Sequence, residues 1–213
     1  MINTKRRYTL GHEIFNSVSH GMSGGLAIAG TVLLIIFAAR NSNAWSVVSV
    51  SIYGASLILF YVMSSIYHGI SSFNARNVLR VFDHLTIFFL IAGTYTPLTL
   101  ITLRGPIGWV LFGLEWAIAI VGIVLTSSNF DKFKKYSLIF YFAMGWLVVF
   151  FAGPVMDSFT SFEVLFLLIG GLLYTGGAIF YAVKQFKYAH AFYHVIVTAG
   201  SIFHFFAIFS LVY

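Results

Sequence analysis

The segment HAFYH, residues 190–194, places two histidines four positions apart at the start of a long apolar run. In a helix this spacing puts both imidazoles on one face, about 6 Å apart along the axis. Two more groups that suit a metal site stand at the ends of other apolar runs, His68 in SSIYH and Asp83 in VFDH. Three neutral imidazoles with one open position are typical of catalytic zinc, which lowers the pKa of its water to about 7.

Asp83 and Ser64 are the predicted catalytic residues beside this site. Asp83 could accept a hydrogen bond from the metal's water and act as a general base. Ser64 lies four residues before His68 on the same helical face, where its hydroxyl could hydrogen-bond near the metal or polarise a substrate carbonyl. Structural alternatives stay open: Asp83 could pair with Arg80, Ser64 could bond to its own helix, and the histidine pair could be an interfacial polar pair.

Three further polar residues in the apolar runs lie apart from this group. His204 is ten residues beyond His194, roughly 15 Å along a helix, and is expected to be a hydrogen-bonded interior histidine. His84 points about 100° away from Asp83 and could support the site only indirectly. Glu115 lies inside the fourth run, where a charge costs several kcal/mol, so it needs a partner or a proton.

Polar and kink-forming residues elsewhere in the runs are interpreted as structural. Glu13, Asn16 and His20 share one helical face, for which we favour a helix-start cap and an interfacial polar face, with a catalytic role as the alternative. Gly93 and Pro97, in GTYTP, predict a kink in the third run that could open a cavity above the site.

Composition indicates where these residues are located. The chain has 213 residues, of which 60% are hydrophobic and only 8% are charged, and its mean hydropathy is +0.93. Such a chain cannot build a water-soluble surface, so it is predicted to be an integral membrane protein. It has no cysteine, so any metal must be held by nitrogen and oxygen ligands. The net charge of +6 lies in short connectors and indicates topology rather than nucleic-acid binding.

Seven apolar runs are long enough to cross a bilayer, since a spanning helix needs roughly 20 apolar residues. They leave no separate soluble part, so we predict one all-α, seven-helix transmembrane domain over residues 1–213. Basic residues precede the first run, but the polar stretch after them and the six later runs favour an uncleaved helix over a signal peptide. The predicted spans lie near residues 15–39, 44–70, 79–103, 106–127, 136–153, 164–183 and 190–213.

The Lys and Arg residues are distributed unequally between the two sides of the predicted bundle. Arg40 and Arg104 lie on one side, and the other ten lie on the opposite side. Because cytoplasmic loops carry the excess of Lys and Arg, we predict a cytoplasmic N-terminus and an external C-terminus. This orientation brings the candidate metal site to the cytoplasmic ends of three different helices. The ten residues are Lys5, Arg6, Arg7, Arg76, Arg80, Lys132, Lys134, Lys135, Lys184 and Lys187.

Three segments, in this order, resemble the hemolysin III family of bacterial membrane proteins. That family is related to the progestin and adipoQ receptors, which include the adiponectin receptors, and more distantly to alkaline ceramidases. The resemblance extends from Glu13 to His204, nearly the whole chain. The segments are SSIYH (64–68), FDHLTIFFLIAGTYTP (82–97) and HAFYHVIVTAGSIFH (190–204).

The resemblance implies a seven-helix protein with its N-terminus inside and zinc near the cytoplasmic face. It implies that His68, His190 and His194 bind zinc, that Asp83 holds a water on the metal, and that Ser64 is the serine of the family's Ser-x-x-x-His motif. Relatives are linked to ceramide amide hydrolysis and membrane-lipid homeostasis, and the family name refers to haemolysis. The family and the lack of a sorting extension imply a bacterial plasma membrane, and the short connectors argue against a protein-hormone receptor.

Three functions are consistent with the sequence. The one we favour is a zinc-dependent hydrolase that cleaves an amide or ester bond of a membrane lipid entering sideways from the bilayer. The second is a non-catalytic lipid sensor with structural zinc. The third is a pore-forming haemolysin or ion transporter, for which Glu115 and His204 would be the midplane polar residues. Iron or manganese could also suit this donor set, and the lipid and oligomeric state stay open.

Overall fold

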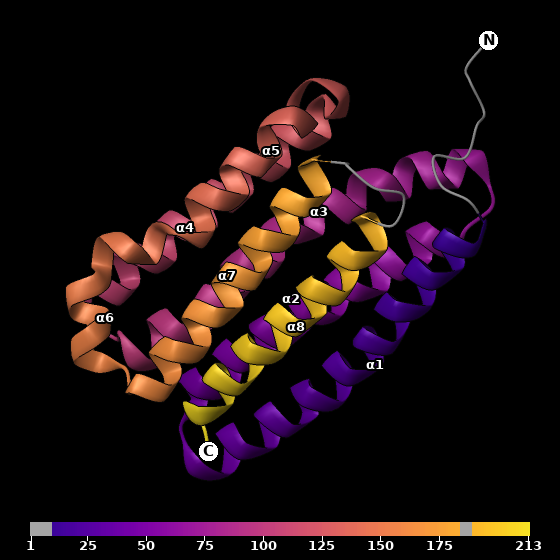
Figure 1. Cartoon of the computed structure of the whole chain (residues 1–213). Helices are drawn as coiled ribbons and strands as arrows, with labels where there is room; N and C mark the ends of the chain where they lie inside the picture. The colour runs from indigo at the N-terminus through magenta and orange to yellow at the C-terminus, as the bar shows by residue number, and fades with distance from the viewer. Residues whose placement is uncertain (1–9, 184–188) are drawn as a thin grey trace.

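A computed structural model of the chain describes residues 10–183 and 189–213, which form a bundle of long helices (Figure 1). Seven helices are long and apolar enough to cross a membrane, and the described part contains no strand. The predicted all-α, seven-helix fold is therefore confirmed. Five of the basic residues used to predict the orientation, Lys5, Arg6, Arg7, Lys184 and Lys187, lie outside the described residues.

The elements differ from the predicted runs mainly at their ends. The first helix begins at Leu10, before the predicted start, and therefore includes Glu13. The short fifth run is instead a longer broken span, Phe130–Ser158. The elements are α1 (Leu10–Asn41), α2 (Ala44–Gly69), α3 (Phe73–Pro97), η1 (Leu98–Thr102), α4 (Pro106–Ser128), α5 (Phe130–Gly145), η2 (Leu147–Phe151), α6 (Ala152–Ser158), α7 (Ser161–Val183) and α8 (Ala189–Ser210).

Local sequence signals explain where several helices begin. The side chain of Asn43 accepts hydrogen bonds from the first backbone N–H groups of α2, and Asn129 does the same for α5. Thr160 and Glu163 form a reciprocal capping box at the start of α7, with each side chain bonded to the other's backbone N–H. Gly105, at φ 141°, turns the chain into α4, whose first residue is a proline.

The helices close into a ring in which the first and last spans are neighbours. Helix α1 packs against α2 and α8, α2 against α3, α3 against α4 and α5, α5 against α7, and α7 against α8. Figure 1 shows the indigo α1 beside the yellow α8 along the bundle. Of the seven spans, the one made of α3 and η1 is the most enclosed. This ring brings residues from opposite ends of the sequence together.

The third span changes helix type where the sequence predicts a kink. Pro97 ends α3, and a π-helical turn follows, in which the N–H of Leu103 bonds to the carbonyl of Leu98 over 3.0 Å. A proline lacks the donor that an α-helix needs, so a wider turn at this point is expected. Four residues earlier, Gly93 lies against Ser56 of α2, where an added Cβ would be 2.2 Å from the serine Oγ. The π-helical turn therefore follows a point of close helix contact.

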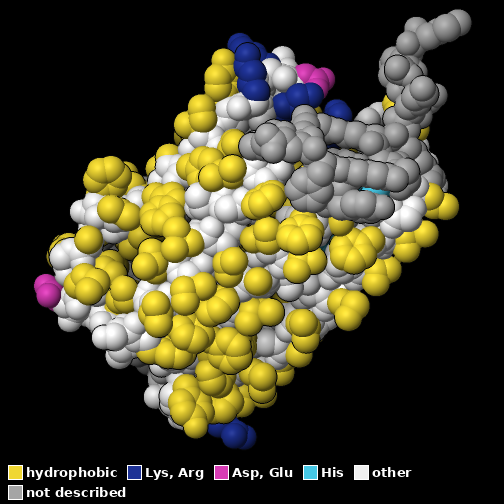
Figure 2. Space-filling view, viewed as in Figure 1, with side chains coloured by type: hydrophobic (Ala, Val, Ile, Leu, Met, Phe, Trp, Pro, Cys, Tyr) yellow, Lys and Arg dark blue, Asp and Glu magenta, His cyan; other side chains and the backbone are white. Residues whose placement is uncertain are grey.

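The outer surface has the pattern of a membrane protein. Large apolar side chains are exposed along the bundle, including Leu26, Val121 and Ile139. Figure 2 shows hydrophobic side chains over the long sides and Lys and Arg at the ends. Two of the described basic residues, Arg104 and Arg40, lie near one end of the bundle, and the others lie near the opposite end, where α3 and α5 begin. The separation of charge expected from the sequence is present among the described residues.

Candidate metal centre

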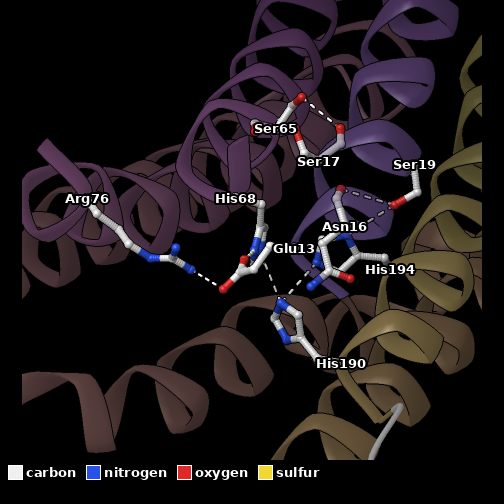
Figure 3. Close-up of polar contacts among 9 residues, drawn as sticks. All are labelled: Glu13, Asn16, Ser17, Ser19, Ser65, His68, Arg76, His190 and His194. Carbon is white, nitrogen blue, oxygen red and sulfur yellow. Dashed lines mark hydrogen bonds and ion pairs between the residues drawn. The ribbon is translucent and has the colours of Figure 1, made fainter. Parts of the chain in front are cut away.

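Three histidine side chains converge where α2 ends and α8 begins (Figure 3). The Nε2 atom of His190 lies 3.0 Å from Nε2 of His68 and 3.1 Å from Nε2 of His194. One nitrogen from each ring lies within 4.8 Å of the others. His68 and His194 are buried and His190 is half-buried. The structure therefore brings together the three residues that the sequence analysis predicts as metal ligands.

A carboxylate from α1 orients the His68 ring. Nδ1 of His68 donates a hydrogen bond to Oε2 of Glu13 over 2.7 Å, and Oε1 of Glu13 accepts one from Arg76 (Figure 3). This contact assigns the ring proton to Nδ1 and leaves the Nε2 lone pair free for a metal. A carboxylate behind a metal-binding histidine is a common arrangement, because it fixes the tautomer and makes the ring a better ligand.

Helix α1 also positions the His194 ring. Ser19 Oγ lies 3.4 Å from Nδ1 of His194, which also interacts with the backbone of Asn16. The ring of His20 stacks on that of His194, with centroids 3.6 Å apart and planes inclined by 20°. Contacts at Nδ1 turn the Nε2 atom of His194 toward His190, as they do for His68.

The short contacts among the three rings fit a metal ion better than hydrogen bonds. Nε2 of His190 carries at most one proton, and it faces the Nε2 lone pairs of both His68 and His194. Its two contacts therefore cannot both be full hydrogen bonds, whereas a cation among the three nitrogens satisfies all of them. In a tetrahedral zinc site with bonds of 2.0–2.1 Å, neighbouring nitrogens lie about 3.3 Å apart. The two distances from Nε2 of His190, 3.0 and 3.1 Å, are close to this value, and the three ligand atoms all lie within 4.8 Å of one another.

Asp83 and Ser64 lie beside the histidine cluster, on α3 and α2. Their side chains interact with each other, and the carboxylate of Asp83 also interacts electrostatically with His68. Within residues 10–183 and 189–213, Asp83 forms no ion pair with Arg80, so that structural alternative is not observed. Ser64 is buried, whereas Asp83 is half-buried on a cavity wall.

A cavity of about 680 Å³ reaches this cluster from between α3, α5, α7 and α8. Asp83 and His190 line it at the metal-site end, and His204 lines it further along α8. Fourteen residues separate the two histidines, so the cavity follows α8 for roughly 21 Å. Its wall is largely apolar and aromatic, including Leu138 and Tyr174, and its volume suits a small-molecule or lipid ligand.

The remaining polar residues do not join the cluster. His204 donates a hydrogen bond from Nε2 to the carbonyl of Leu167 over 3.1 Å, which confirms an interior, hydrogen-bonded histidine. His84 bonds through Nδ1 to the carbonyl of Arg80 and lines the cavity. Glu115 is fully buried, and its carboxyl oxygens have no hydrogen-bond partner within the described part of the chain. No role follows from its position.

Glu13 and His20 are the contributors that sequence reasoning missed. The sequence analysis interprets them as a cap and an interfacial face, but Glu13 bonds to side chains of two other helices and His20 is stacked on a candidate ligand. Both are buried, at 3% and 1% exposure. Glu13 and His20 lie on one face of a membrane span, and buried polar groups in such spans need partners. This shared face was the sequence feature that could have indicated their contacts with the site.

These features define a class of protein: an integral membrane bundle of seven helices whose second and last spans meet at a three-histidine candidate metal centre. The model of the family described as Haemolysin-III related matches residues 8–205, which is most of the chain. The chain therefore belongs to the haemolysin III family, as its sequence segments predict.

Curated relatives agree with this assignment over nearly full lengths. The chain is 39% identical to Hemolysin-3 of Bacillus cereus over 196 residues, which cover 92% of this chain and 90% of the relative. It is 38% identical to a Hemolysin-3 homolog of Bacillus subtilis (strain 168) over 201 residues, covering 94% of each. A more distant relative is the monocyte to macrophage differentiation factor of Homo sapiens, 27% identical over 218 residues, with 99% of this chain and 89% of the relative covered.

Proposed function

We propose that this protein is a zinc-dependent membrane hydrolase that cleaves an amide or ester bond of a lipid, with a role in membrane-lipid homeostasis. The observation that carries the proposal is the junction of the histidine cluster with the cavity. His190 belongs to both, and Asp83 lines the same end. An apolar chain could occupy the cavity and hold the bond to be cleaved near Asp83.

The residues at this junction suit hydrolysis. His68, His190 and His194 would hold zinc, which when bound supplies a Lewis acid for a carbonyl oxygen and for water. Asp83 would accept the proton of the attacking water as its oxygen bonds to the carbonyl carbon. Asp83 would then return that proton to the leaving nitrogen or oxygen as the C–N or C–O bond breaks, giving a carboxylic acid and an amine or alcohol. Ser64 would position Asp83 through their side-chain contact.

The charge distribution supports a cytoplasmic location for the site. Arg76 and Arg80 on α3 and three lysines on α5 lie at the same end of the bundle as the histidine cluster, and Arg40 and Arg104 lie at the other. Because Lys and Arg are enriched on the cytoplasmic side of membrane proteins, we assign the cluster to that side of a bacterial plasma membrane.

The first test is metal content, measured by plasma mass spectrometry on protein purified in detergent without chelator. We expect about one zinc per chain in the wild type and loss of that zinc in a His190→Ala, His194→Ala double variant. His204→Gln is the matched control, because it alters a histidine of the same helix and cavity outside the cluster, and it should keep the metal. Wild-type protein without stoichiometric metal would exclude the proposed mechanism.

The second test separates catalysis from metal binding. Asp83→Asn should keep its zinc and lower turnover of a panel of amide and ester lipids by at least about 100-fold, since general acid–base catalysis contributes about 10²–10⁴-fold. Full metal with no turnover of any lipid by the wild type would favour the lipid sensor with structural zinc. Liposome leakage that survives loss of the histidines but fails in Glu115→Gln would favour the pore-forming alternative.

A further inference from the structure

Three cationic side chains line the metal-site end of the large cavity. Arg80 projects from the first turns of α3, and Lys134 and Lys135 from the first turns of the neighbouring α5. Figure 2 shows Lys and Arg gathered at this end of the molecule. Arg80 and Asp83 are three residues apart, roughly 4.5 Å along the helix axis, so Arg80 lies about one helical turn from the proposed reaction site.

Membrane topology alone does not account for this arrangement. Lys132 shares the first turns of α5 and serves topology equally well, yet it does not line the cavity. Arg76 is engaged by Glu13, whereas Nε of Arg80 is buried without a hydrogen-bond partner among the described residues. An unsatisfied buried donor destabilises the protein, and an anionic ligand would satisfy it.

The other charged and aromatic groups at this end leave a positive excess. Two carboxylates oppose the three cations. Asp131 pairs with Lys134 over 2.6 Å and also interacts electrostatically with Arg80, and Asp83 lines the same end of the cavity, so one net positive charge is left. The guanidinium of Arg80 lies 4.8 Å from the ring centre of Phe130, and the ammonium of Lys135 lies 4.8 Å from that of Tyr136. These cation–π contacts hold the two side chains in place without neutralising them.

We propose that the lipid substrate has one apolar chain and a phosphate-bearing headgroup. The chain lies along the cavity toward His204, and the phosphate binds among Arg80, Lys134 and Lys135. The bond to be cleaved lies between these parts, near Asp83. A phosphate fits better than a carboxylate, because it carries up to two negative charges and has three oxygens that can accept from several cationic donors at once. The assignment of a cleaved bond rests on the proposed function, but the binding mode does not.

Binding can be measured without turnover. The probes are lysophosphatidic acid and a monoacylglycerol with the same acyl chain, titrated by native mass spectrometry into detergent-purified protein. We expect lysophosphatidic acid to bind at least about tenfold more tightly, and we expect Arg80→Gln to remove most of that preference while leaving monoacylglycerol affinity unchanged. Arg80→Lys should restore part of it. Lys132→Gln is the matched control for a general surface charge and should behave as the wild type.

The same titration in the His190→Ala, His194→Ala variant separates this inference from the proposed hydrolase. Retention of the headgroup preference in that variant supports the binding mode whatever the metal and turnover assays give. Equal affinity for the two lipids would overturn the inference, as would an equal loss in Arg80→Gln and Lys132→Gln. Displacement of lysophosphatidic acid by inorganic phosphate at similar concentrations would indicate a site for the free anion and would also overturn it.

Discussion

Glu13 contacts a candidate metal ligand from a helix that supplies no ligand itself. Its two carboxylate oxygens bond to His68 and Arg76, so one residue of α1 links α2 and α3. Such a contact raises the basicity of the ligand ring and fixes its orientation. The role of Glu13 is therefore to position His68, which predicts an effect on metal affinity.

We expect Glu13→Gln to weaken zinc binding by about 10–100-fold, the usual effect of removing a residue that orients a ligand. The amide keeps an oxygen that can accept from His68, but it removes the negative charge behind the ring. Competition with a chromogenic zinc chelator measures the change. Asp131→Asn is the control, because it removes an exposed carboxylate that pairs with Lys134 and lies outside the histidine cluster. Unchanged zinc affinity in Glu13→Gln would show that the hydrogen bond to His68 is structural only.

The residues of the site differ in how readily they can be predicted. The spacing of His190 and His194 predicts that they share one helical face. The order of the membrane spans then predicts that His68 lies at the same depth in the membrane. The contact of Glu13 depends on how α1 is rotated against α2, and no local pattern encodes that rotation. Sequence reasoning therefore identifies residues that lie at the right depth better than residues that reach the site from the side.

At the scale of elements, α3 connects the site to the rest of the bundle. It carries Asp83 near one end, contacts α2 closely at Gly93, and widens into η1 after Pro97. Because α2 carries Ser64 and His68, the spacing between these two helices controls the distance between the proposed base and the proposed ligands.

Gly93→Ala should therefore lower both stability and activity. The new Cβ would lie 2.2 Å from Oγ and 2.7 Å from Cβ of Ser56, so α2 and α3 must move apart. We expect a loss of about 1–3 kcal/mol, which thermal unfolding in detergent measures as a lower Tm. Gly113→Ala on α4 is the control, since nothing lies within 4 Å of its added Cβ. Equal Tm values for the two variants would contradict tight packing at Gly93.

Element types were more predictable than element boundaries. Seven apolar runs indicate seven spans because a bilayer requires that length of apolar helix. The break between α5 and α6 was missed because η2, with the sequence LVVFF, is as apolar as the helices around it. The early start of α1 was also missed, since its first turns contain polar residues that become buried only through contacts with α2 and α8.

At the scale of the whole molecule, the histidine cluster joins spans that are far apart in sequence. His68 belongs to the second span and His190 and His194 to the last, and α1 packs on both. A metal at this position would cross-link one end of the helix ring. Binding to the folded state alone stabilises that state, so metal and stability are linked.

Zinc should therefore raise the Tm of the metal-free protein in a concentration-dependent manner. At free zinc about 100-fold above Kd, the expected stabilisation is about 2.7 kcal/mol. Differential scanning fluorimetry after chelator treatment and zinc titration measures the shift, and the His190→Ala, His194→Ala variant should show none. A similar shift in that variant would mean that zinc stabilises the protein from another site.

Because the ring closes between α1 and α8, the three histidines come together only late in biosynthesis. A ribosome delivers His68 with the second helix, and it delivers His190 and His194 only with the last. A metal held by all three histidines could therefore not bind before α8 is inserted, and until then Glu13 and His68 would lie in the membrane without the other two histidines. Metal capture would then follow the insertion of α8 and would distinguish molecules that contain this helix from those that do not yet contain it.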